Sequence, residues 1–373
     1  MKIVHVIPSL NAGGAELALS RLIVNDGKEN LHRVVCLNSL GTHHQLLLDN
    51  NIKIICLHFN KYFLGILPFI RLYKFLRTEK PDVIQTWMYH SDLIGGLIGK
   101  ILGVPRIVWG IRGPLYKKFT SKRTYLIALV CAHLSKLIPD AVISNSHYAL
   151  KTHIEFGYDA NKMKVIFNGY NIPKYKPKIN LPRDGIKKSK ILMGTVGRFD
   201  PHKNHIGLVN ALGIVNKSFQ DFEFFFIGNN LDKNNKILTE AIENNNLKDK
   251  SHLVGLTKNI NSYYLKFDLF VLSSIAESFP NVIAEAMMHG VPCISSDVGD
   301  ARIIIKESGW VVPKNSDKAL ADGIINAINE INDLNIYRSR KETAFKIIKS
   351  DFGIQNMITD YNNVWRNDEK SKY

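Results

Sequence analysis

Two successive series of short apolar segments, each followed by a stretch with helical periodicity, constrain the fold of this chain most. Alternation of strands and helices favours a parallel sheet with helices on both faces, because each helix returns the chain to the start of the next strand. The sequence therefore predicts an α/β protein with two doubly wound domains. Expected strands lie at residues 2–8, 33–37, 53–57, 83–86, 106–109 and 141–144 in the first series, and at 191–197, 222–227, 252–254, 269–272 and 293–295 in the second.

Residues 171–190 separate the two series. They contain Pro173, Pro177 and Pro182, several lysines and little apolar periodicity, which is typical of a linker. The length of 373 residues also suits two domains. We therefore expect an N-terminal domain at 1–175, a C-terminal domain at 176–353, and a last helix at 354–373 that carries apolar residues at helical spacing.

Composition excludes several classes of protein. Hydrophobic residues make up 45% of the chain and charged residues 22%, the balance of a globular protein. The longest apolar runs fall short of the roughly 20 residues that a membrane-spanning helix needs, and the first eight residues resemble a strand more than a signal peptide. None of the cysteines forms a Cys-x-x-Cys pair, so we expect reduced, buried thiols at Cys36, Cys56, Cys131 and Cys293.

The net charge of +16 is unevenly distributed. Residues 1–175 hold 22 Lys and Arg against 10 Asp and Glu, a net +12, whereas residues 176–373 hold 27 against 23, a net +4. Such a field implies an anionic partner, which could be nucleic acid, an anionic membrane or a phosphorylated substrate.

Ligands of open parallel sheets bind at the loops that follow the carboxyl ends of the strands. The first such loop contains Gly13 and Gly14, directly before an expected helix. Adjacent glycines let the backbone approach a ligand, and a helix start attracts phosphate. The loop lacks the Gly-x-Gly-x-x-Gly dinucleotide pattern, and an ordinary strand-to-helix turn explains it equally well.

The first strand of the second series ends near Arg198, and Lys203 follows after a turn. Both cations are expected at the carboxyl edge of the second sheet, where two positive charges could hold a diphosphate without a metal ion. The alternative is a pair of solvated surface cations.

The segment from Glu277 to Glu285 places two carboxylates around a helix start, with Ser278, Phe279, Pro280 and Asn281 between them. Free backbone N–H groups at a helix start suit phosphate, and carboxylates suit hydroxyl groups. Together they predict a site for a nucleotide-sugar. For Glu285 the alternative is a favourable interaction with the helix dipole alone.

At this point the chain resembles family 4 of the retaining glycosyltransferases, which have the GT-B architecture of two Rossmann-like domains facing each other across a cleft. The resemblance covers nearly the whole chain. It rests on Gly13-Gly14-Ala15-Glu16, Ser144-Asn145-Ser146, Asn168-Gly169, Gly197-Arg198 with Lys203-Asn204, the Glu-x7-Glu motif at Glu277 and Glu285, Gly290-Val291-Pro292 and Gly299.

The resemblance implies roles for these residues. Glu277 is expected to contact hydroxyls of the transferred sugar, Glu285 to hold the ribose, and Arg198 with Lys203 to neutralise the leaving diphosphate. Backbone groups at Phe279–Asn281 are expected to bind phosphate or sugar, Gly14 to let the first domain approach the diphosphate, and Gly255 to lie beside the base. The last helix is expected to cross back to the N-terminal domain.

Two further positions bear on this resemblance. His90 follows the strand at 83–86, at a position that in the family faces donor sugar and acceptor; a lone histidine is otherwise more often structural. Many relatives have Gly-x-Gly after the strand at 222–227, whereas this chain has Gly228-Asn229-Asn230. That departure puts the local contacts to base or phosphate in question.

The sequence therefore predicts transfer, with retention, of a hexose or N-acetylhexosamine from a UDP-sugar, or else a GDP-sugar, to a polyprenyl-diphosphate-linked saccharide of O-antigen, capsule or a related polysaccharide. No Asp-x-Asp motif occurs, so we expect no metal and no other cofactor. Basic segments at 61–77 and 112–123 could lie on the anionic cytoplasmic face of the inner membrane, or could pack on the core with a solvated basic face. Alternatives are a nucleotide-sugar 2-epimerase of the same architecture, a nucleic-acid-binding protein and a non-catalytic sugar-binding module.

Overall fold

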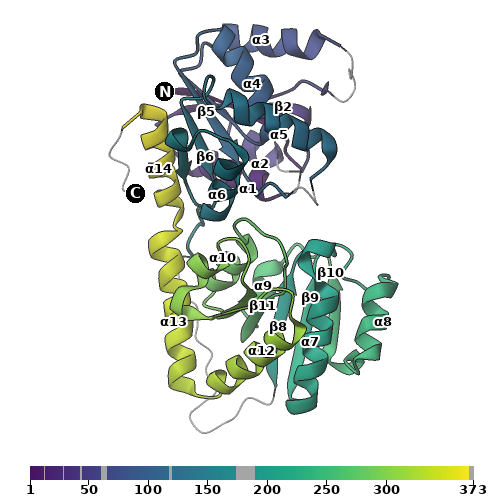
Figure 1. The fold of residues 1–373 in the computed structure, drawn as a ribbon. Coiled ribbons are helices and arrows are strands. Elements are labelled where there is room, and N and C mark those ends of the chain that lie inside the picture. Colours follow the sequence, from purple (N-terminus) through teal and green to yellow (C-terminus); the bar gives the residue numbers. More distant parts are fainter. Residues whose placement is uncertain are drawn as a thin grey trace. The chain divides into compact units, whose positions relative to one another are not determined.

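The computed structural model describes the chain except for residues 12, 28, 43, 60–64, 117–119, 174–189 and 369–373. The chain forms two compact units (Figure 1). Unit 1 comprises Met1–Gly169 and Ile354–Tyr373, and unit 2 comprises Tyr170–Gly353. Most of the expected linker, and parts of both basic segments, lie outside the described residues.

Unit 1 is built on a seven-stranded sheet with the order β3-β2-β1-β4-β5-β6-β7, in which every neighbouring pair is parallel. The chain adds β2 and β3 on one side of β1 and then β4 to β7 on the other side, which gives the doubly wound topology. The carboxyl ends of all strands lie at one edge of the sheet. The strands are β1 Lys2–Ser9, β2 Leu31–Ser39, β3 Lys53–Cys56, β4 Val83–Thr86, β5 Arg106–Ile111, β6 Ala141–Ser144 and β7 Met163–Val165.

Helices cover both faces of this sheet (Figure 1). One face packs against α1 and α14, and the opposite face packs against α3, α4 and α5. The central strands β1, β4, β5 and β6 are buried along nearly their whole length, because helices cover the apolar side chains on both faces of the sheet. The helices are α1 Gly14–Asn25, α2 His44–Asp49, α3 Leu67–Glu79, α4 Tyr89–Ile101, α5 Lys122–Leu134, α6 His147–Phe156 and α14 Ile354–Arg366.

A buried polar network joins α14 to the sheet of unit 1. Trp87 donates its indole N–H to His5 Nδ1 at 3.3 Å, so His5 donates from Nε2 to His32 Nδ1 at 2.9 Å. His32 in turn donates to Asp26 Oδ2 at 2.9 Å. The other oxygen of Asp26 accepts the side-chain amide of Asn362 on α14 at 2.8 Å. Burial of such groups is tolerated only when each has a partner, so this chain of hydrogen bonds fixes where the last helix packs.

Unit 2 has a six-stranded parallel sheet with the order β10-β9-β8-β11-β12-β13. Its strands are β8 Ile191–Val196, β9 Phe222–Ile227, β10 Ser251–Gly255, β11 Leu269–Leu272, β12 Cys293–Ser296 and β13 Trp310–Val312. The reversal lies between β8 and β11. Its helices are α7 His205–Ser218, α8 Lys236–Asn244, α9 Ile260–Tyr264, α10 Asn281–Met288, α11 Ala301–Ile305, α12 Asp317–Ile331 and α13 Leu334–Asp351.

The prediction of two doubly wound α/β domains is confirmed. Sequence reasoning missed two strands, β7 and β13, each of three residues and each at the edge of its sheet. Such short edge strands carry too few residues for a period-2 pattern to stand out. Within the described residues, no helix is both long enough and apolar enough to cross a membrane.

Candidate functional site

Glu277 lies in the loop that follows β11, the central buried strand of unit 2. Its Oε1 accepts the ammonium of Lys203 at 2.6 Å and the hydroxyl of Ser274 at 2.8 Å. Both partners and the carboxylate are largely shielded from solvent, with exposed side-chain fractions of 22% for Lys203 and 13% for Glu277. The structure therefore brings together two of the residues expected to act on the donor, and it fixes the carboxylate in one orientation.

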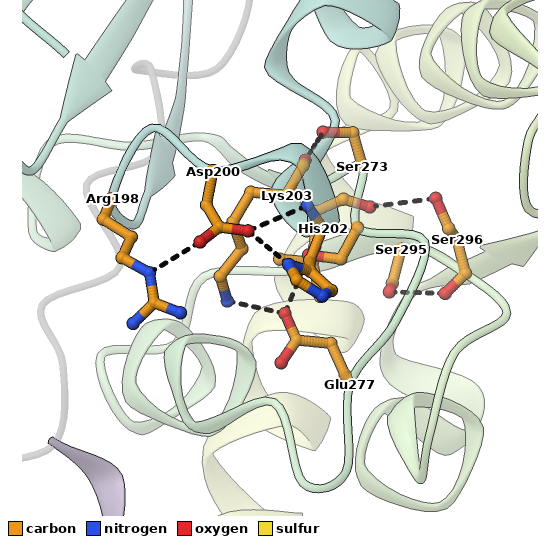
Figure 2. A network of polar contacts seen from close by, with 10 residues as sticks. Arg198, Asp200, His202, Lys203, Ser273, Glu277, Ser295 and Ser296 are labelled. Atoms are coloured by element: carbon orange, nitrogen blue, oxygen red, sulfur yellow. Dashed lines mark hydrogen bonds and ion pairs between the residues drawn. The ribbon is translucent and has the colours of Figure 1, made fainter. Parts of the chain in front are cut away.

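Contacts of the backbone also hold the segment that carries Lys203. The residue ends a short 3-10 helix, Pro201–Lys203, and its carbonyl accepts the hydroxyl of Ser273 at 2.8 Å. Asn204, which follows in the left-handed conformation with φ 51°, caps α7 by accepting the backbone N–H of Gly207. Figure 2 shows the ammonium of Lys203 directed at Glu277.

Arg198 follows β8 and donates from Nε to Asp200 Oδ2 at 3.0 Å (Figure 2). Asp200 also accepts both the backbone N–H and the ring nitrogen of His202. Partial burial raises the pKa of Asp200, but the hydrogen bonds from His202 and Arg198 outweigh it and hold the pKa well below its usual range. The guanidinium, with an exposed side-chain fraction of 69%, is thus oriented but open to an anion.

The start of α10 supplies the backbone groups expected to bind phosphate. Asn281 is the first residue of the helix and accepts the hydroxyl of Tyr170 at 2.6 Å. Phe279 is buried against the ring of Phe352, with ring centroids 5.6 Å apart. The turn from Ser278 to Asn281 is therefore held by two aromatic residues from the two ends of unit 2.

Gly299 explains why the Glu277 loop can take its course. It has φ 52°, and a Cβ there would lie 2.2 Å from the carbonyl oxygen of Ser278. The next residue, Asp300, donates its backbone N–H to that same oxygen at 2.9 Å. A larger residue at 299 would push the loop away from its position.

Glu285 is placed in the second turn of α10. Tyr264 donates its hydroxyl to Glu285 Oε2 at 3.5 Å, a weak hydrogen bond. Burial raises the pKa of Tyr264 well above its ordinary value, so its hydroxyl stays protonated and can donate to the carboxylate. This contact gives Glu285 a fixed neighbour, and its assignment to the ribose stays a prediction.

Gly228 and Gly255 bring two loops of unit 2 together. Gly228 donates its N–H to the carbonyl of Gly255 at 2.8 Å, and a Cβ on Gly228 would lie 1.7 Å from the carbonyl oxygen of Gly197. Asn230, where many relatives have glycine, has φ 62°. Asparagine tolerates this left-handed conformation better than other non-glycine residues, so the departure in sequence preserves the backbone turn.

In unit 1, Gly13 and Gly14 form the start of α1 at the carboxyl end of β1. Gly13 is the N-cap in an extended conformation and Gly14 is the first helical residue. The carboxylate of Glu16 folds back over Gly13, where a Cβ would lie 2.4 Å from Glu16 Oε2. Burial raises the pKa of Glu16, partly offset by a backbone hydrogen bond and by Arg112. Gly13 thus leaves room for a side chain of its own helix, and the expected approach of this loop to a ligand stays a prediction.

His90 is the second residue of α4 and lies at the protein surface, with one part of its ring covered by the protein. Partial burial of the ring lowers its pKa, which keeps it neutral at pH 7. The residue before the helix, Met88, has φ 70°, a conformation unusual for methionine, and donates its N–H to the carbonyl of Gly110 at 2.7 Å. Strain of about 1–3 kcal/mol at such a position is common beside functional residues.

Sequence reasoning missed several residues that position the expected ones: Asp200 with His202, Ser273 with Ser274, and Tyr170. Asp200 could have been found, because an acid two residues after Arg198 can reach its guanidinium. Tyr170 could not, because 111 residues separate it from Asn281. Within the described part of the chain, no group of three or more His, Cys, Asp or Glu side chains could hold a metal ion.

Comparison with known proteins agrees with the predicted fold class. Residues 20–173 match the model of "Glycosyltransferase Family 4", and residues 178–344 match the model of "Glycosyl transferases group 1". The chain belongs to the family 4 glycosyltransferases. As a family 4 glycosyltransferase it has the GT-B architecture, and the matched regions cover most of each doubly wound unit.

Two bacterial relatives are similar over most of their length. The UDP-Gal:alpha-D-GlcNAc-diphosphoundecaprenol alpha-1,3-galactosyltransferase of Escherichia coli is 27% identical over 78% of this chain and 78% of its own. A Campylobacter jejuni alpha-1,4-N-acetyl-D-galactosaminyltransferase, whose name gives an undecaprenol-diphosphate-linked acceptor, is 24% identical over 89% of this chain and 90% of its own.

Solved structures share the fold. HepE of Anabaena in complex with UDP superposes with a TM-score of 0.82 at 21% identity, over 98% of this chain and all of that one. The lipopolysaccharide outer core galactosyltransferase WaaB gives a TM-score of 0.73 at 18% identity, over 98% of this chain and 99% of that one. At such identities the likeness is one of fold.

Proposed function

We propose that this glycosyltransferase moves a hexose or N-acetylhexosamine, with retention, from a nucleotide-diphosphate sugar to a polyprenyl-diphosphate-linked saccharide. A UDP-sugar is the favoured donor and a GDP-sugar the alternative. The product would enter O-antigen, capsule or a related polysaccharide. The acceptor class is supported by the names of the E. coli and C. jejuni relatives, both of which carry an undecaprenol-diphosphate acceptor.

The observation that carries the proposal is the ion pair between Lys203 and Glu277 at the carboxyl edge of the unit 2 sheet. In the reaction, the bond between the anomeric carbon and the diphosphate breaks, and the leaving diphosphate gains negative charge. Lys203, Arg198 and the N–H groups at the start of α10 stabilise that charge. Because these fixed positive groups supply the stabilisation, the proposed transfer needs no metal ion.

Glu277 has the complementary task. Its carboxylate, oriented by Lys203 and Ser274, accepts hydrogen bonds from hydroxyls of the transferred sugar as the ring becomes oxocarbenium-like. Glu285 holds the ribose hydroxyls, and Gly255 lies beside the base. The acceptor hydroxyl attacks the face that the diphosphate leaves and gives its proton to a departing phosphate oxygen, which accounts for retention. His90, neutral at pH 7, hydrogen-bonds to the sugar or the acceptor.

The proposed location follows from the acceptor. A polyprenyl-linked saccharide is confined to a bilayer, so we place the enzyme as a peripheral protein on the anionic cytoplasmic face of the inner membrane. The net charge of +12 on residues 1–175 supports this placement, since anionic lipids attract basic surfaces. Nucleic acid is not needed to explain the charge.

A donor screen tests the proposal. UDP- and GDP-sugars are incubated with a synthetic polyprenyl-diphosphate saccharide, with and without EDTA, and nucleotide release and the anomeric configuration of the product are followed by NMR. We expect release that depends on acceptor, persists in EDTA and gives the donor's own anomeric configuration. Inverted product would refute retention. Acceptor-independent nucleotide release or an isomerised donor would indicate a 2-epimerase instead.

A further inference from the structure

The outer sides of α4 and α5 in unit 1 expose large apolar side chains where solvated polar ones are expected. We name this surface the α4–α5 face. Three of its members are exposed to a large extent: Ile101 at 72%, Leu126 at 61% and Leu137 at 68%. The whole apolar set is Leu97 and Ile101 from α4, and Leu126, Leu129, Val130 and Leu137 from α5 and the turn after it.

Both helices pack an apolar inner side on the sheet and carry further large apolar residues on the outer side. On the inner side of α4, Ile98 is buried, and small residues let the helix lie close to the sheet: a Cβ on Gly95 would lie 2.9 Å from Thr86, and one on Gly96 would lie 2.5 Å from Trp109. The inner side of α5 includes the buried Ala128 and Ala132. A surface helix normally carries polar residues on its outer side. Packing within unit 1 therefore does not account for the exposed apolar residues.

The apolar residues form one surface. On α5, Leu126, Leu129 and Val130 follow the i, i+3, i+4 spacing of one helical face. α4 packs against α5, and both return from the carboxyl to the amino edge of the same parallel sheet, so they run in the same direction (Figure 1). Ile101 and Leu137 therefore lie at the same end of the face.

Cations predominate around this face. Residues 93–139 contain no Asp or Glu, and Asp140, which follows them, accepts the backbone N–H of Ile107 at 2.7 Å. Exposed cations border the apolar residues on both helices and at both ends of α5: Lys100, Lys122, Arg123 and Lys136. An apolar surface rimmed mainly by cations is complementary to an anionic bilayer, in which acyl chains accept the apolar side chains and headgroups accept the cations.

We propose that the α4–α5 face is the surface on which this protein lies on an anionic phospholipid bilayer, an inference that rests on the proposed function for its biological setting. A second copy of the chain is disfavoured as the occupant, because two such faces would bring cations against cations with no acid in residues 93–139 to pair them. The N-termini of both helices, with His90 on α4 and Lys122 on α5, lie at the carboxyl edge of the sheet. Docking by this face would bring that edge to the level of lipid-linked acceptors.

The segment at 61–77, considered above as either lipid-binding or core-packed, has both characters. Within α3, Leu72 and Leu76 are buried, whereas Leu67, Phe69 and Ile70 are exposed. Because α3 packs beside α4, its exposed end extends the apolar surface without being needed for the proposal. Lys117 and Lys118, the other expected lipid contacts, lie outside the described residues.

Vesicle flotation of the full chain, without donor or acceptor, tests the face. The vesicles are phosphatidylcholine with or without phosphatidylglycerol. We expect binding that requires phosphatidylglycerol. Replacing Leu126 and Leu137 together by serine is expected to lower the partition coefficient about tenfold, and Lys122→Gln or Lys136→Gln about fivefold each. Ile237→Ser, at a residue of unit 2 that is 63% exposed, is the matched control and should bind like the wild type.

Several outcomes would overturn the proposal. These are a wild type that does not float with phosphatidylglycerol, face variants that float as well as Ile237→Ser, or a wild-type dimer that the Leu126/Leu137 double variant converts to a monomer. The last result would make the face an interface between copies. Because flotation uses no substrate, face-dependent binding without any transfer would refute the proposed function alone, and transfer without such binding would refute the face alone.

Discussion

The carboxyl edges of the two sheets carry their charge in opposite ways. In unit 2 the key cations are each matched to an acid: Lys203 to Glu277 at 2.6 Å and Arg198 to Asp200 at 3.0 Å. In unit 1 the corresponding edge presents the exposed Lys122 and the imidazole of His90. The half-buried Arg112 lies with its guanidinium 5.1 Å from the ring centre of Trp87.

The difference shows how each edge is kept in shape. Paired charges fix side chains that must meet a charged ligand, and the ligand can exchange for the internal partner. Buried networks instead fix the backbone from which a few exposed groups project. Substitutions of the paired charges in unit 2 should therefore affect the rate of transfer more than stability. Substitutions in the buried network of unit 1 should affect stability more than the rate.

The largest expected effect is that of Lys203→Ala on catalysis. Removing the ammonium takes away one of the fixed positive groups that stabilise the leaving diphosphate, which should lower kcat about 10²–10³-fold. Glu277→Gln should also lower kcat, and the double variant should lose less than the two single losses combined, because the residues act as a pair. Steady-state kinetics with the donor found by the screen measure this.

Lys217→Ala, at an exposed cation in the last turn of α7 and outside the loops proposed to hold the donor, serves as the control for charge alone. Near-normal kcat for Lys203→Ala would contradict the proposed role. So would a Lys203→Ala loss that thermal unfolding shows to come from destabilisation.

In unit 1, Asp26→Asn should lower the free energy of unfolding by about 2–4 kcal/mol. The native carboxylate accepts hydrogen bonds from His32, Asn30 and Asn362, and an amide would turn a donor towards at least one of them. Urea denaturation measures the change. Asp49→Asn, where the carboxylate is exposed and accepts only Gln45, should stay within about 0.5 kcal/mol. If the two substitutions lowered the free energy of unfolding equally, the network would not be a special source of stability in unit 1.

The same network gives unit 1 an acid-sensitive stability. Burial and the neighbouring His32 lower the pKa of His5, so the folded state binds a proton less readily than the unfolded state, and stability falls as pH drops below about 6.5. For Asp26, burial raises the pKa, but hydrogen bonds from His32, Asn30 and Asn362 lower it by more, so its pKa in the folded state lies below the ordinary value. The stability that Asp26 contributes is therefore lost only below about pH 4. In a plot of the free energy of unfolding against pH, Asp26→Asn should therefore remove the fall below about pH 4 and keep the fall below about pH 6.5.

The sequence predicted most of what lies near a strand end in unit 2. Arg198, Lys203 and Glu277 each follow an apolar strand, so topology alone brings them to one edge. Local spacing also indicated α10 as the helix after Glu277. These features could be predicted because they depend on neighbours within a few residues.

The unit 1 network could not be predicted in the same way. His5 and His32 stand within strands that read as apolar, and Asn362 is 336 residues from Asp26. No short-range pattern indicates that a polar side chain inside a core segment will find a partner that far along the chain. The exposure of Leu126 and Leu137 also depends on how α5 packs on the sheet, so only the structure shows it.

Tyr170→Phe should have an intermediate effect, confined to donor binding. It removes the hydroxyl that donates to Asn281 at 2.6 Å, so the first turn of α10 is less well ordered before the phosphate binds. We expect KM for the donor to rise about fivefold with kcat nearly unchanged. Tyr337→Phe removes a hydroxyl that donates to Asp268 at 2.9 Å in the core of unit 2, and should lower stability without raising KM. A Tyr170→Phe enzyme that loses stability and keeps its KM would show that the contact is purely structural.

The smallest expected effect tests whether Asn230 acts through its backbone or its side chain. With φ 62°, Asn230→Gly should keep the turn and change the free energy of unfolding by less than about 0.5 kcal/mol. Asn230→Ala should cost about 1–2 kcal/mol, because alanine disfavours this conformation. Gly228→Ala should cost more than either, since its Cβ would lie 1.7 Å from the carbonyl of Gly197. If Asn230→Gly instead changed the preference between UDP- and GDP-sugars, the side chain would contact the base, and the departure from glycine would be a determinant of donor choice.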